Sequence, residues 1–309
     1  MIDFTNCKKY NKTYSGANGN KICISYNNKK YMLKFPSTPT KKTELSYANG
    51  CISEFISCHI YNMLGVDAQN TILGIYNTGK KEKIVVACED FTDIGVVIQD
   101  FGSLKNQFID SIHNGYGTEL DDILEAIEQQ NQIDQFTLLT RFWDMFVIDA
   151  LLGNFDRHNG NWGFLYNQMT DSISLAPVYD CGSCLLPQAD KQTVATILSS
   201  EKEINNRIYN YPNSAIKIND KKLNYYSFLT TTDDPNCLES IVKIENRFNY
   251  KEIENFIDTI ECLDNQQKEF YKRYIFQRHE KIILPSYKRA ISMSIQQNQN
   301  EDSYDYEDR

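Results

Sequence analysis

Two short polar segments near the middle of the chain carry the residue types best suited to chemistry. Residues 153–163 read Gly-Asn-Phe-Asp-Arg-His-Asn-Gly-Asn-Trp-Gly and contain Asp156 and Asn161, and residues 176–182 read Ala-Pro-Val-Tyr-Asp-Cys-Gly and contain Asp180. Phosphoryl transfer requires an acid that takes the proton of the attacking hydroxyl, and oxygen ligands for the Mg²⁺ that bridges the phosphates. With Asp156 as the base and Asn161 and Asp180 as metal ligands, these segments predict Mg²⁺-dependent phosphoryl transfer from ATP.

The spacing of these residues supports that prediction. The pattern Asp-x-x-x-x-Asn from Asp156 to Asn161 is that of the catalytic loop of protein kinases, and the Asp-Cys-Gly at 180–182 stands where such enzymes have Asp-Phe-Gly. His158 and Tyr179 flank these residues, and we expect them to contact the phosphates of the nucleotide or to order the loop. A hydrogen-bonded structural histidine is an equal alternative for His158.

A lysine and a glutamate earlier in the chain are candidates for the remaining catalytic roles. Lys34 lies in an apolar strand, residues 31–36, where a lysine is unfavourable unless it is paired or meets an anion. We therefore expect Lys34 to contact the α- and β-phosphates, with Glu54 as its partner. A lysine at the solvent edge and a solvated glutamate are the alternative. The predicted catalytic residues are Asp156, Lys34, Glu54 and His158.

A glycine-containing loop before the lysine strand is a candidate for binding phosphates. In Ser15-Gly16-Ala17-Asn18-Gly19-Asn20-Lys21, the glycines would let backbone N–H groups approach phosphate oxygens without an intervening Cβ. An ordinary turn has a similar composition. At the end of the last strand in this region, backbone groups of Glu89 to Phe91 could hydrogen-bond the adenine ring, although a simple acidic turn would look the same. The predicted nucleotide-binding residues are Gly16, Ala17, Asn18, Gly19, Lys21, Lys34, Glu89, Phe91, His158 and Tyr179.

Hydrophobic periodicity predicts the elements that position these residues. The first 91 residues predict a small sheet that carries one helix, with strands at 22–26, 30–35, 71–76 and 83–88 and the helix at 44–64. Later in the chain we predict a hairpin at 162–166 and 173–176 and helices at 120–130, 136–152, 236–247, 251–260 and 266–295, the last interrupted by Pro285. The fold class is thus α+β, a two-lobed protein-kinase-like fold with a small β-rich N-lobe (1–91), a larger, mostly helical C-lobe (92–295) and an acidic, disordered tail (296–309).

Composition limits the classes of function. The 309 residues carry a formal charge of -9, which argues against nucleic-acid binding because phosphate backbones are held by surplus Lys and Arg. No secretory signal and no apolar run long enough for a membrane span are present, so we expect a cytoplasmic protein, with secretion by a non-Sec route as an effector left open. Nine scattered cysteines do not suggest disulfides, and the Cys-x-x-Cys at 181–184 lacks a second ligand pair for zinc. No oligomeric state is predicted.

Taken together, these segments resemble the HipA-like serine/threonine kinases. The similarity lies in the lysine strand (31–36), the catalytic loop (154–161) and the metal loop (175–180), and it extends to residues 16–21, 86–92, 143–146 and 181–184. The resemblance implies a kinase-like two-lobed fold, MgATP as the donor and protein Ser/Thr hydroxyls as acceptors. It also implies that Lys34 contacts the phosphates, that Asp156 is the base and that Asn161 and Asp180 hold Mg²⁺. HipA-like kinases can phosphorylate a serine of their own near the phosphate loop, and Ser15 is the candidate here.

Three other functions are compatible with parts of the pattern. Phosphoinositide kinases have a similar Asp-Arg-His-x-x-Asn loop, so a lipid or small-molecule hydroxyl is an alternative acceptor. A two-metal phosphoesterase would need several histidine and carboxylate ligands, whereas the four histidines of this chain have unrelated spacings. A pseudokinase usually lacks a catalytic residue, whereas Lys34, Asp156, Asn161 and Asp180 are all present.

Overall fold

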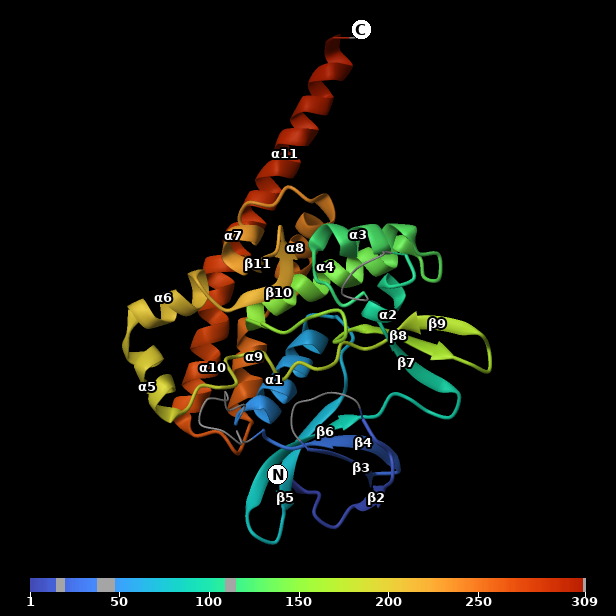
Figure 1. Ribbon diagram of the computed structural model, residues 1–309. Helices are drawn as coiled ribbons and strands as arrows, with labels where there is room; N and C mark the ends of the chain where they lie inside the picture. Colours follow the sequence, from blue (N-terminus) through green and yellow to red (C-terminus); the bar gives the residue numbers. More distant parts are fainter. Residues whose placement is uncertain (15–19, 38–47, 109–114, 308–309) are drawn as a thin grey trace.

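The chain folds into a small β-sheet lobe and a larger helical lobe (Figure 1). The computed structural model describes residues 1–14, 20–37, 48–108 and 115–307. The β-sheet lobe contains a six-stranded sheet that is antiparallel except for the β1–β5 pair. In spatial order its strands are β1 (Ile2–Asp3), β5 (Thr71–Asn77), β6 (Glu82–Glu89), β4 (Lys29–Lys34), β3 (Lys21–Tyr26) and β2 (Lys8–Tyr10). The α+β fold class is confirmed.

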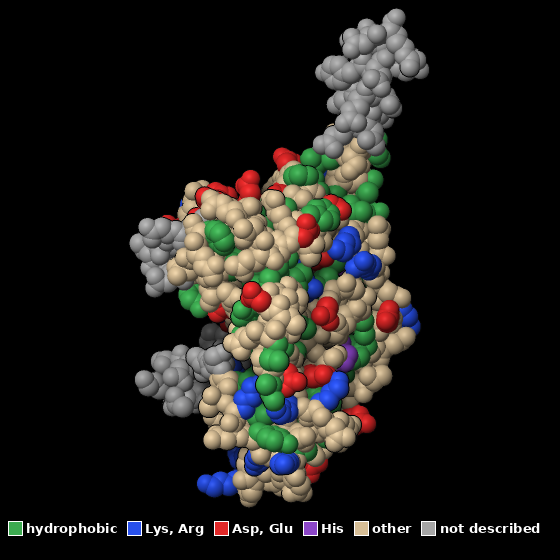
Figure 2. All heavy atoms as spheres, turned by 90° about the vertical axis from the view of Figure 1, so that its right-hand side faces the viewer, with side chains coloured by type: hydrophobic (Ala, Val, Ile, Leu, Met, Phe, Trp, Pro, Cys, Tyr) green, Lys and Arg blue, Asp and Glu red, His purple; other side chains and the backbone are tan. Residues whose placement is uncertain are grey.

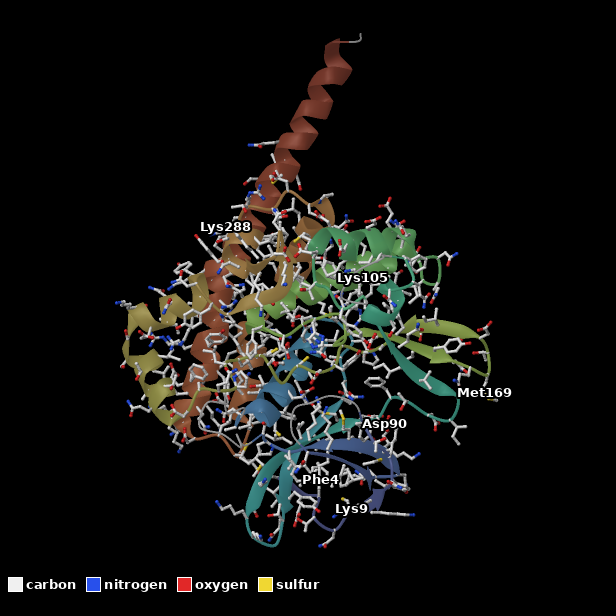
Figure 3. All side chains as sticks on the ribbon, viewed as in Figure 1. Phe4, Lys9, Asp90, Lys105, Met169 and Lys288 are labelled. Atoms are coloured by element: carbon white, nitrogen blue, oxygen red, sulfur yellow. The ribbon has the colours of Figure 1, made fainter. Side chains whose placement is uncertain are left out.

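The β3–β4 hairpin fixes the face on which Lys34 lies. Asn27 and Asn28 form the predicted turn, both with a positive φ, which two-residue hairpins of this kind require. Successive side chains in a strand alternate between the two faces. Leu33 packs with Phe4 in a small core on the outer side of the sheet (Figure 3). Lys34 therefore faces the opposite side, where helix α1 (Gly50–Met63) covers the sheet.

Helix α1 starts later than the sequence predicts. The predicted helix spans 44–64, whereas α1 begins at Gly50, and residues 38–47 lie outside the described part of the chain. The helix contains buried residues on several sides, among them Ile52, Ile56 and Ile60. It packs against β5 and β6 on one side, and Tyr61 donates a hydrogen bond to the Met145 carbonyl in the helical lobe. Helix α1 thus connects the two lobes.

The helical lobe is built around α4 (Gln135–Leu152), which is buried along most of its length. Asp134 caps its start by accepting a hydrogen bond from the Thr137 N–H. The helix ends at Gly153 in the left-handed conformation, with a φ of 67°. A Cβ on Gly153 would lie 2.3 Å from the Tyr274 hydroxyl, so a glycine is required at this point. The chain then enters the catalytic loop directly from a buried helix.

The other helices surround α4, and two small β-structures flank the catalytic loop. The helices are α2 (Phe101–Lys105), α3 (Leu120–Gln129), α5 (Lys191–Ser199), α6 (Glu201–Tyr209), α7 (Tyr225–Leu229), α8 (Pro235–Arg247), α9 (Tyr250–Asp258) and α10 (Asn265–Arg278). A three-stranded sheet consists of β7 (Val96–Asp100), β8 (Gly163–Asn167) and β9 (Ser172–Leu175), and a separate hairpin consists of β10 (Asn213–Ile218) and β11 (Lys221–Asn224). The predicted β8–β9 hairpin is present, whereas β7, β10 and β11 were not predicted.

The C-terminal helices differ from the prediction in two ways. A π-helical segment, His279–Ile283, joins α10 to α11 (Leu284–Glu307), and Pro285 follows it at the start of α11. Because a π-helical segment shifts the hydrogen-bond pattern, a proline without an N–H is accommodated and does not interrupt the helix. Residues 296–307, predicted as part of a disordered tail, continue α11 as a helix. Extension of an existing helix needs no new nucleation.

Candidate active site

A cleft of about 520 Å³ lies between the six-stranded sheet and the helical lobe. It brings together predicted residues from five separate parts of the chain. Those that line the cleft are Lys21, Lys34, Glu54, Phe91, Asp156, His158, Asn161, Tyr179 and Asp180. Ser15, Gly16, Ala17, Asn18 and Gly19 lie outside the described residues. The cleft is large enough for a small ligand and is lined by several polar groups that converge on one space.

Lys34 connects three elements at the centre of this cleft. Its Nζ lies 2.9 Å from Glu54 Oε2 on α1 and 3.0 Å from Asp180 Oδ1 in the metal loop. The other oxygen of Glu54 accepts a hydrogen bond from the Cys181 N–H at 3.1 Å. The side chain of Glu54 is 2% exposed, so this carboxylate is buried and fully used. The structure therefore brings together the lysine and glutamate that the sequence suggested as a pair.

The pKa shifts in this cluster follow from burial and pairing. Burial alone would lower the pKa of Lys34, but the carboxylates of Asp180 and Glu54 outweigh that effect and hold it well above its ordinary value. Burial raises the pKa of Glu54, and Lys34 opposes the rise. The charge of Lys34 lowers the pKa of Asp180 to about 2. Asp180 is therefore a carboxylate at neutral pH, as a metal ligand must be.

Lys21 adds a second positive charge beside Lys34. The two residues lie directly opposite each other on β3 and β4, and both line the cleft. Like charges in opposite positions of an antiparallel pair are destabilising. Burial lowers the pKa of Lys21, and the charge of Lys34 lowers it further. The carboxylates of Asp180 and Glu54 oppose this lowering. Both ammonium groups remain beside the cleft, where they would attract phosphates.

Hydrogen bonds within the catalytic loop hold Asp156 and Asn161 in a fixed relation. The Asn161 Nδ2 donates to the Asp156 carbonyl at 2.8 Å, and the Asp156 N–H donates to Asn154 Oδ1 at 3.0 Å. Because its Nδ2 is used in this way, Asn161 has its Oδ1 left for a cation. His158 Nδ1 accepts from the Gly160 N–H at 3.0 Å, so this histidine orders the loop and also lines the cleft.

The Asp156 carboxyl is an acceptable general base in this environment. Burial raises its pKa, His158 and Lys222 lower it, and the neighbouring Asp180 raises it. A raised pKa makes a carboxylate a better proton acceptor.

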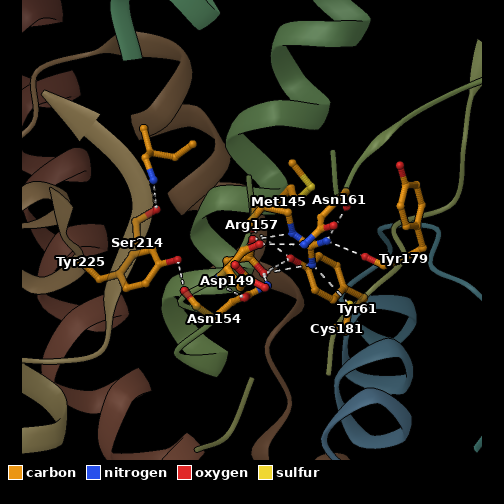
Figure 4. A network of polar contacts seen from close by, with 12 residues as sticks. Tyr61, Met145, Asp149, Asn154, Arg157, Asn161, Tyr179, Cys181, Ser214 and Tyr225 are labelled. Atoms are coloured by element: carbon orange, nitrogen blue, oxygen red, sulfur yellow. Dashed lines mark hydrogen bonds and ion pairs between the residues drawn. The ribbon is translucent and has the colours of Figure 1, made fainter. Parts of the chain in front are cut away.

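A buried acid of helix α4, Asp149, holds the catalytic loop through hydrogen bonds (Figure 4). It is 1% exposed and accepts hydrogen bonds from Arg157 Nε at 2.9 Å, Tyr61 Oη at 2.7 Å and Asn154 Nδ2 at 2.8 Å. These partners come from α1 and from positions on either side of Asp156 in its loop. A buried carboxylate is tolerated only when it is paired and hydrogen-bonded, as it is here.

Arg157 extends this support to the metal loop. Its Nη1 donates to the carbonyls of Asn161 at 2.7 Å and Tyr179 at 2.5 Å, and its Nη2 lies 3.3 Å from Cys181 Sγ. The side chain is 3% exposed and does not line the cleft. Arg157 therefore positions the two loops and has no access to a bound phosphate.

The sequence analysis did not identify Asp149, although one observation could have done so. Asp149 is one of two acids, with Asp144, in the otherwise apolar stretch that runs from Phe142 to Leu152. An arginine lies eight residues from Asp149 on either side, at 141 and at 157. A charged residue in a buried helix must find a partner of opposite charge. Arg141 and Arg157 were equally near in sequence, and the structure pairs Asp149 with Arg157.

The segment that joins the two lobes is held by the side chain of Asp90, which lies within the segment from Glu89 to Phe91 that was predicted for its backbone groups. Asp90 accepts hydrogen bonds from Lys12 Nζ at 2.6 Å, Tyr14 Oη at 2.8 Å and Thr92 Oγ1 at 2.6 Å (Figure 3). All four of these residues line the cleft. Lys12 and Tyr14 are thus held against the segment that joins the two lobes.

The structure separates the two residues proposed to contact adenine. Phe91 lines the cleft, and its ring centroid is 6.0 Å from that of Tyr179. Glu89 does not line the cleft, because its N–H donates to the Asn70 carbonyl and its own carbonyl accepts from Gln69 Nε2. Both backbone groups of Glu89 are thus already used.

The cysteines form no disulfide bonds. All nine are free, and Cys181 and Cys184 are buried. Within the described ranges, no group of three or more His, Cys, Asp or Glu side chains is arranged to hold a metal ion. We also find no helix in those ranges with the length and hydrophobicity needed to cross a bilayer.

Comparisons with known proteins agree with this architecture. Residues 13–224 match the family model of the HipA-like C-terminal domain. The chain is 48% identical over 300 residues to the serine/threonine-protein kinase CtkA of Helicobacter pylori, which covers 96% of this chain and 91% of the relative. The crystal structure of the Helicobacter pylori proinflammatory kinase CtkA superimposes with a TM-score of 0.90 at 47% identity and covers 95% of this chain and 99% of that one.

A more distant structure shows the same fold. HipA in the toxin–antitoxin complex with HipB and operator DNA from Shewanella oneidensis superimposes with a TM-score of 0.54 at 15% identity, and the match covers 89% of this chain and 68% of that one. The family model covers more than half of the chain, and the Helicobacter kinase matches almost all of it. The chain therefore belongs to the HipA-like family of serine/threonine kinases.

Proposed function

We propose that this kinase transfers the γ-phosphate of ATP to Ser/Thr hydroxyls of a protein acceptor, with Asp156 as the base and with Asn161 and Asp180 as the ligands of Mg²⁺. The single observation that supports this most strongly is the convergence on one cleft of Lys34, Asp156, Asn161 and Asp180. Asp156 and Asn161 lie in one loop, whereas the ion pairs of Lys34 connect the sheet, α1 and the metal loop.

The side chains in the cleft fit Mg²⁺. Asn161 and Asp180 offer an amide oxygen and a carboxylate, which are hard oxygen donors of the kind that Mg²⁺ prefers. Such sites use one or two carboxylates together with substrate phosphates and waters, so a cage of three acidic or histidine ligands is not needed. When bound, Mg²⁺ would neutralise charge on the transferred phosphate.

The remaining residues of the cleft would bind and orient the reactants. Lys34, held between Glu54 and Asp180, would place its ammonium group on the phosphates. Asp156 would accept the proton of the acceptor hydroxyl as the new P–O bond forms. On the face shown in Figure 2, several Lys and Arg side chains lie in the lower part of the view, on the lobe of the six-stranded sheet. These positive charges would attract a polyanionic nucleotide.

Replacement of Lys21 by Met is expected to weaken MgATP binding about tenfold, because a charge-assisted hydrogen bond to a phosphate contributes about 1.5–3 kcal/mol. Isothermal titration calorimetry with a non-hydrolysable ATP analogue would measure the change. Lys9→Met is the matched control, since Lys9 is an exposed lysine of the same lobe away from the cleft (Figure 3). Equal affinities for the two variants would show that Lys21 does not contact the nucleotide.

The class of acceptor can be tested directly. Purified protein would be incubated with Mg²⁺ and γ-labelled ATP in the presence of both a generic protein acceptor and phosphoinositide vesicles. Label on Ser or Thr of protein supports the proposal, whereas label confined to lipid would favour a phosphoinositide kinase. ATP binding without any transfer would indicate a pseudokinase. Phosphopeptide mapping of the same sample would test autophosphorylation at Ser15.

A further inference from the structure

The β10–β11 hairpin is attached to the catalytic loop. Tyr225, directly after β11, donates a hydrogen bond to the Asn154 carbonyl at 2.6 Å (Figure 4). On β10, Ser214 and Ile216 line a small cavity together with Arg157. The backbone of the hairpin is therefore fixed relative to the loop that carries the base.

Two lysines lie opposite each other on this hairpin. Lys217 on β10 pairs with Lys222 on β11 in an antiparallel register, so both side chains leave the same face of the hairpin. Like charges in this relation are destabilising. Within the described ranges, neither ammonium group forms a salt bridge or a hydrogen bond. An anion supplied from outside the chain would remove the repulsion.

The position of this pair relative to Asp156 indicates where such an anion would come from. The charge of Lys222 acts on the Asp156 carboxyl, yet no residue of the hairpin lines the nucleotide cleft. Lys222 lies three residues before Tyr225, and Tyr225 is bonded to Asn154, two residues before Asp156. The lysine pair thus belongs to a segment that is anchored to the loop of Asp156 and lies outside the space for ATP, and an acceptor hydroxyl must also reach Asp156 from outside that space. The acids nearby are Asp220 in the turn and Glu119, and Glu119 Oε1 accepts a hydrogen bond from the Asp220 N–H at 3.0 Å.

We propose that Lys217 and Lys222 bind anionic side chains that flank the Ser or Thr to be phosphorylated. The inference depends on the proposed function, because it takes Asp156 as the base that meets the acceptor hydroxyl. Carboxylates of Asp and Glu and the phosphate of an already phosphorylated residue share the required chemistry. The whole chain has a formal charge of -9, so its long-range field does not attract an acidic acceptor. A preference for acidic acceptors would therefore come from local contacts with Lys217 and Lys222.

Peptides with one Ser acceptor and different flanking residues would test this inference. We expect kcat/KM for a peptide with Asp/Glu flanks to exceed that for its Asn/Gln counterpart about five- to tenfold at low salt, since each exposed ion pair contributes modestly. The ratio should fall as NaCl is raised. In the Lys217→Ala/Lys222→Ala double variant the ratio should fall to about one. A third peptide with phosphoserine flanks would show whether phosphate is preferred to carboxylate.

Lys221→Ala provides the matched control, because Lys221 is an exposed lysine of the same strand that pairs with Ile218 and points to the other face. This variant should keep the preference for acidic flanks. Two results would overturn this inference and leave the proposed function intact. One is equal kcat/KM for acidic and neutral peptides with the wild type. The other is an unchanged ratio of kcat/KM for acidic over neutral peptides in the folded double variant. Absence of transfer to every peptide and to the protein itself would overturn both.

Discussion

Replacement of Asp156 by Asn is expected to lower kcat by about 10²–10⁴-fold, the usual contribution of a general base. The amide has nearly the same shape as the carboxylate but cannot accept the proton of the acceptor hydroxyl. MgATP binding should change little, because Asp156 makes no contact with Lys34 and is not a metal ligand in this account. Steady-state kinetics with a protein or peptide acceptor, together with calorimetry of nucleotide binding, would measure both quantities.

The matched control for this variant is Asp258→Asn, which makes the same change at an exposed acid of the helical lobe that does not line the cleft and should leave kcat unchanged. If Asp156→Asn kept near wild-type turnover, Asp156 would not be the base. A large loss of MgATP affinity in Asp156→Asn would instead show that the carboxylate acts on the nucleotide or its metal.

Replacement of Asp149 by Ala is expected to lower the free energy of unfolding by about 3–5 kcal/mol, since it leaves the buried charge of Arg157 without its partner. Tyr61 and Asn154 would lose their acceptor in the same change. Urea unfolding followed by circular dichroism would give the difference. The loss should exceed what any exposed pair contributes, because water cannot replace the missing carboxylate.

An exposed ion pair of the same lobe is the control for the Asp149 variant. Asp258 pairs with Lys272 at 3.0 Å and has a side chain that is 50% exposed. Asp258→Ala should change stability by less than about 1 kcal/mol. Similar losses in both variants would contradict the supporting role assigned to Asp149.

The sequence was sufficient to predict that Lys34, Asp156, Asn161 and Asp180 meet in one cleft, because each lies in a local pattern with a chemical meaning. Lys34 is conspicuous as a charge in an apolar strand, and Asp156 and Asn161 are recognisable by their spacing. Alternation along β4 and the position of Glu54 on the following helix were enough to suggest the pair that the structure brings together at 2.9 Å.

The contacts that support the site could not be obtained from local patterns. Asp90 meets Lys12 across 78 positions of sequence, and the hydroxyl of Tyr61 reaches Asp149 across 88. The first pair depends on where the segment before β3 lies against the end of β6, and the second on how α1 and α4 pack, and periodicity specifies neither. The β10–β11 hairpin was also not predicted, because its strands are short and rich in lysine and asparagine, which are uncommon in strands.

The most direct test of the central claim is the transfer of label from γ-labelled ATP to a protein acceptor by the wild type and by Asp180→Ala, followed by phosphoamino-acid analysis. Asp180 pairs with Lys34 and, in the proposed function, would bind the Mg²⁺ that holds the phosphates of the nucleotide. The account predicts label on Ser or Thr with the wild type in Mg²⁺ and none with the folded variant. Undiminished labelling by Asp180→Ala would contradict the assignment of this cleft as the phosphoryl-transfer site.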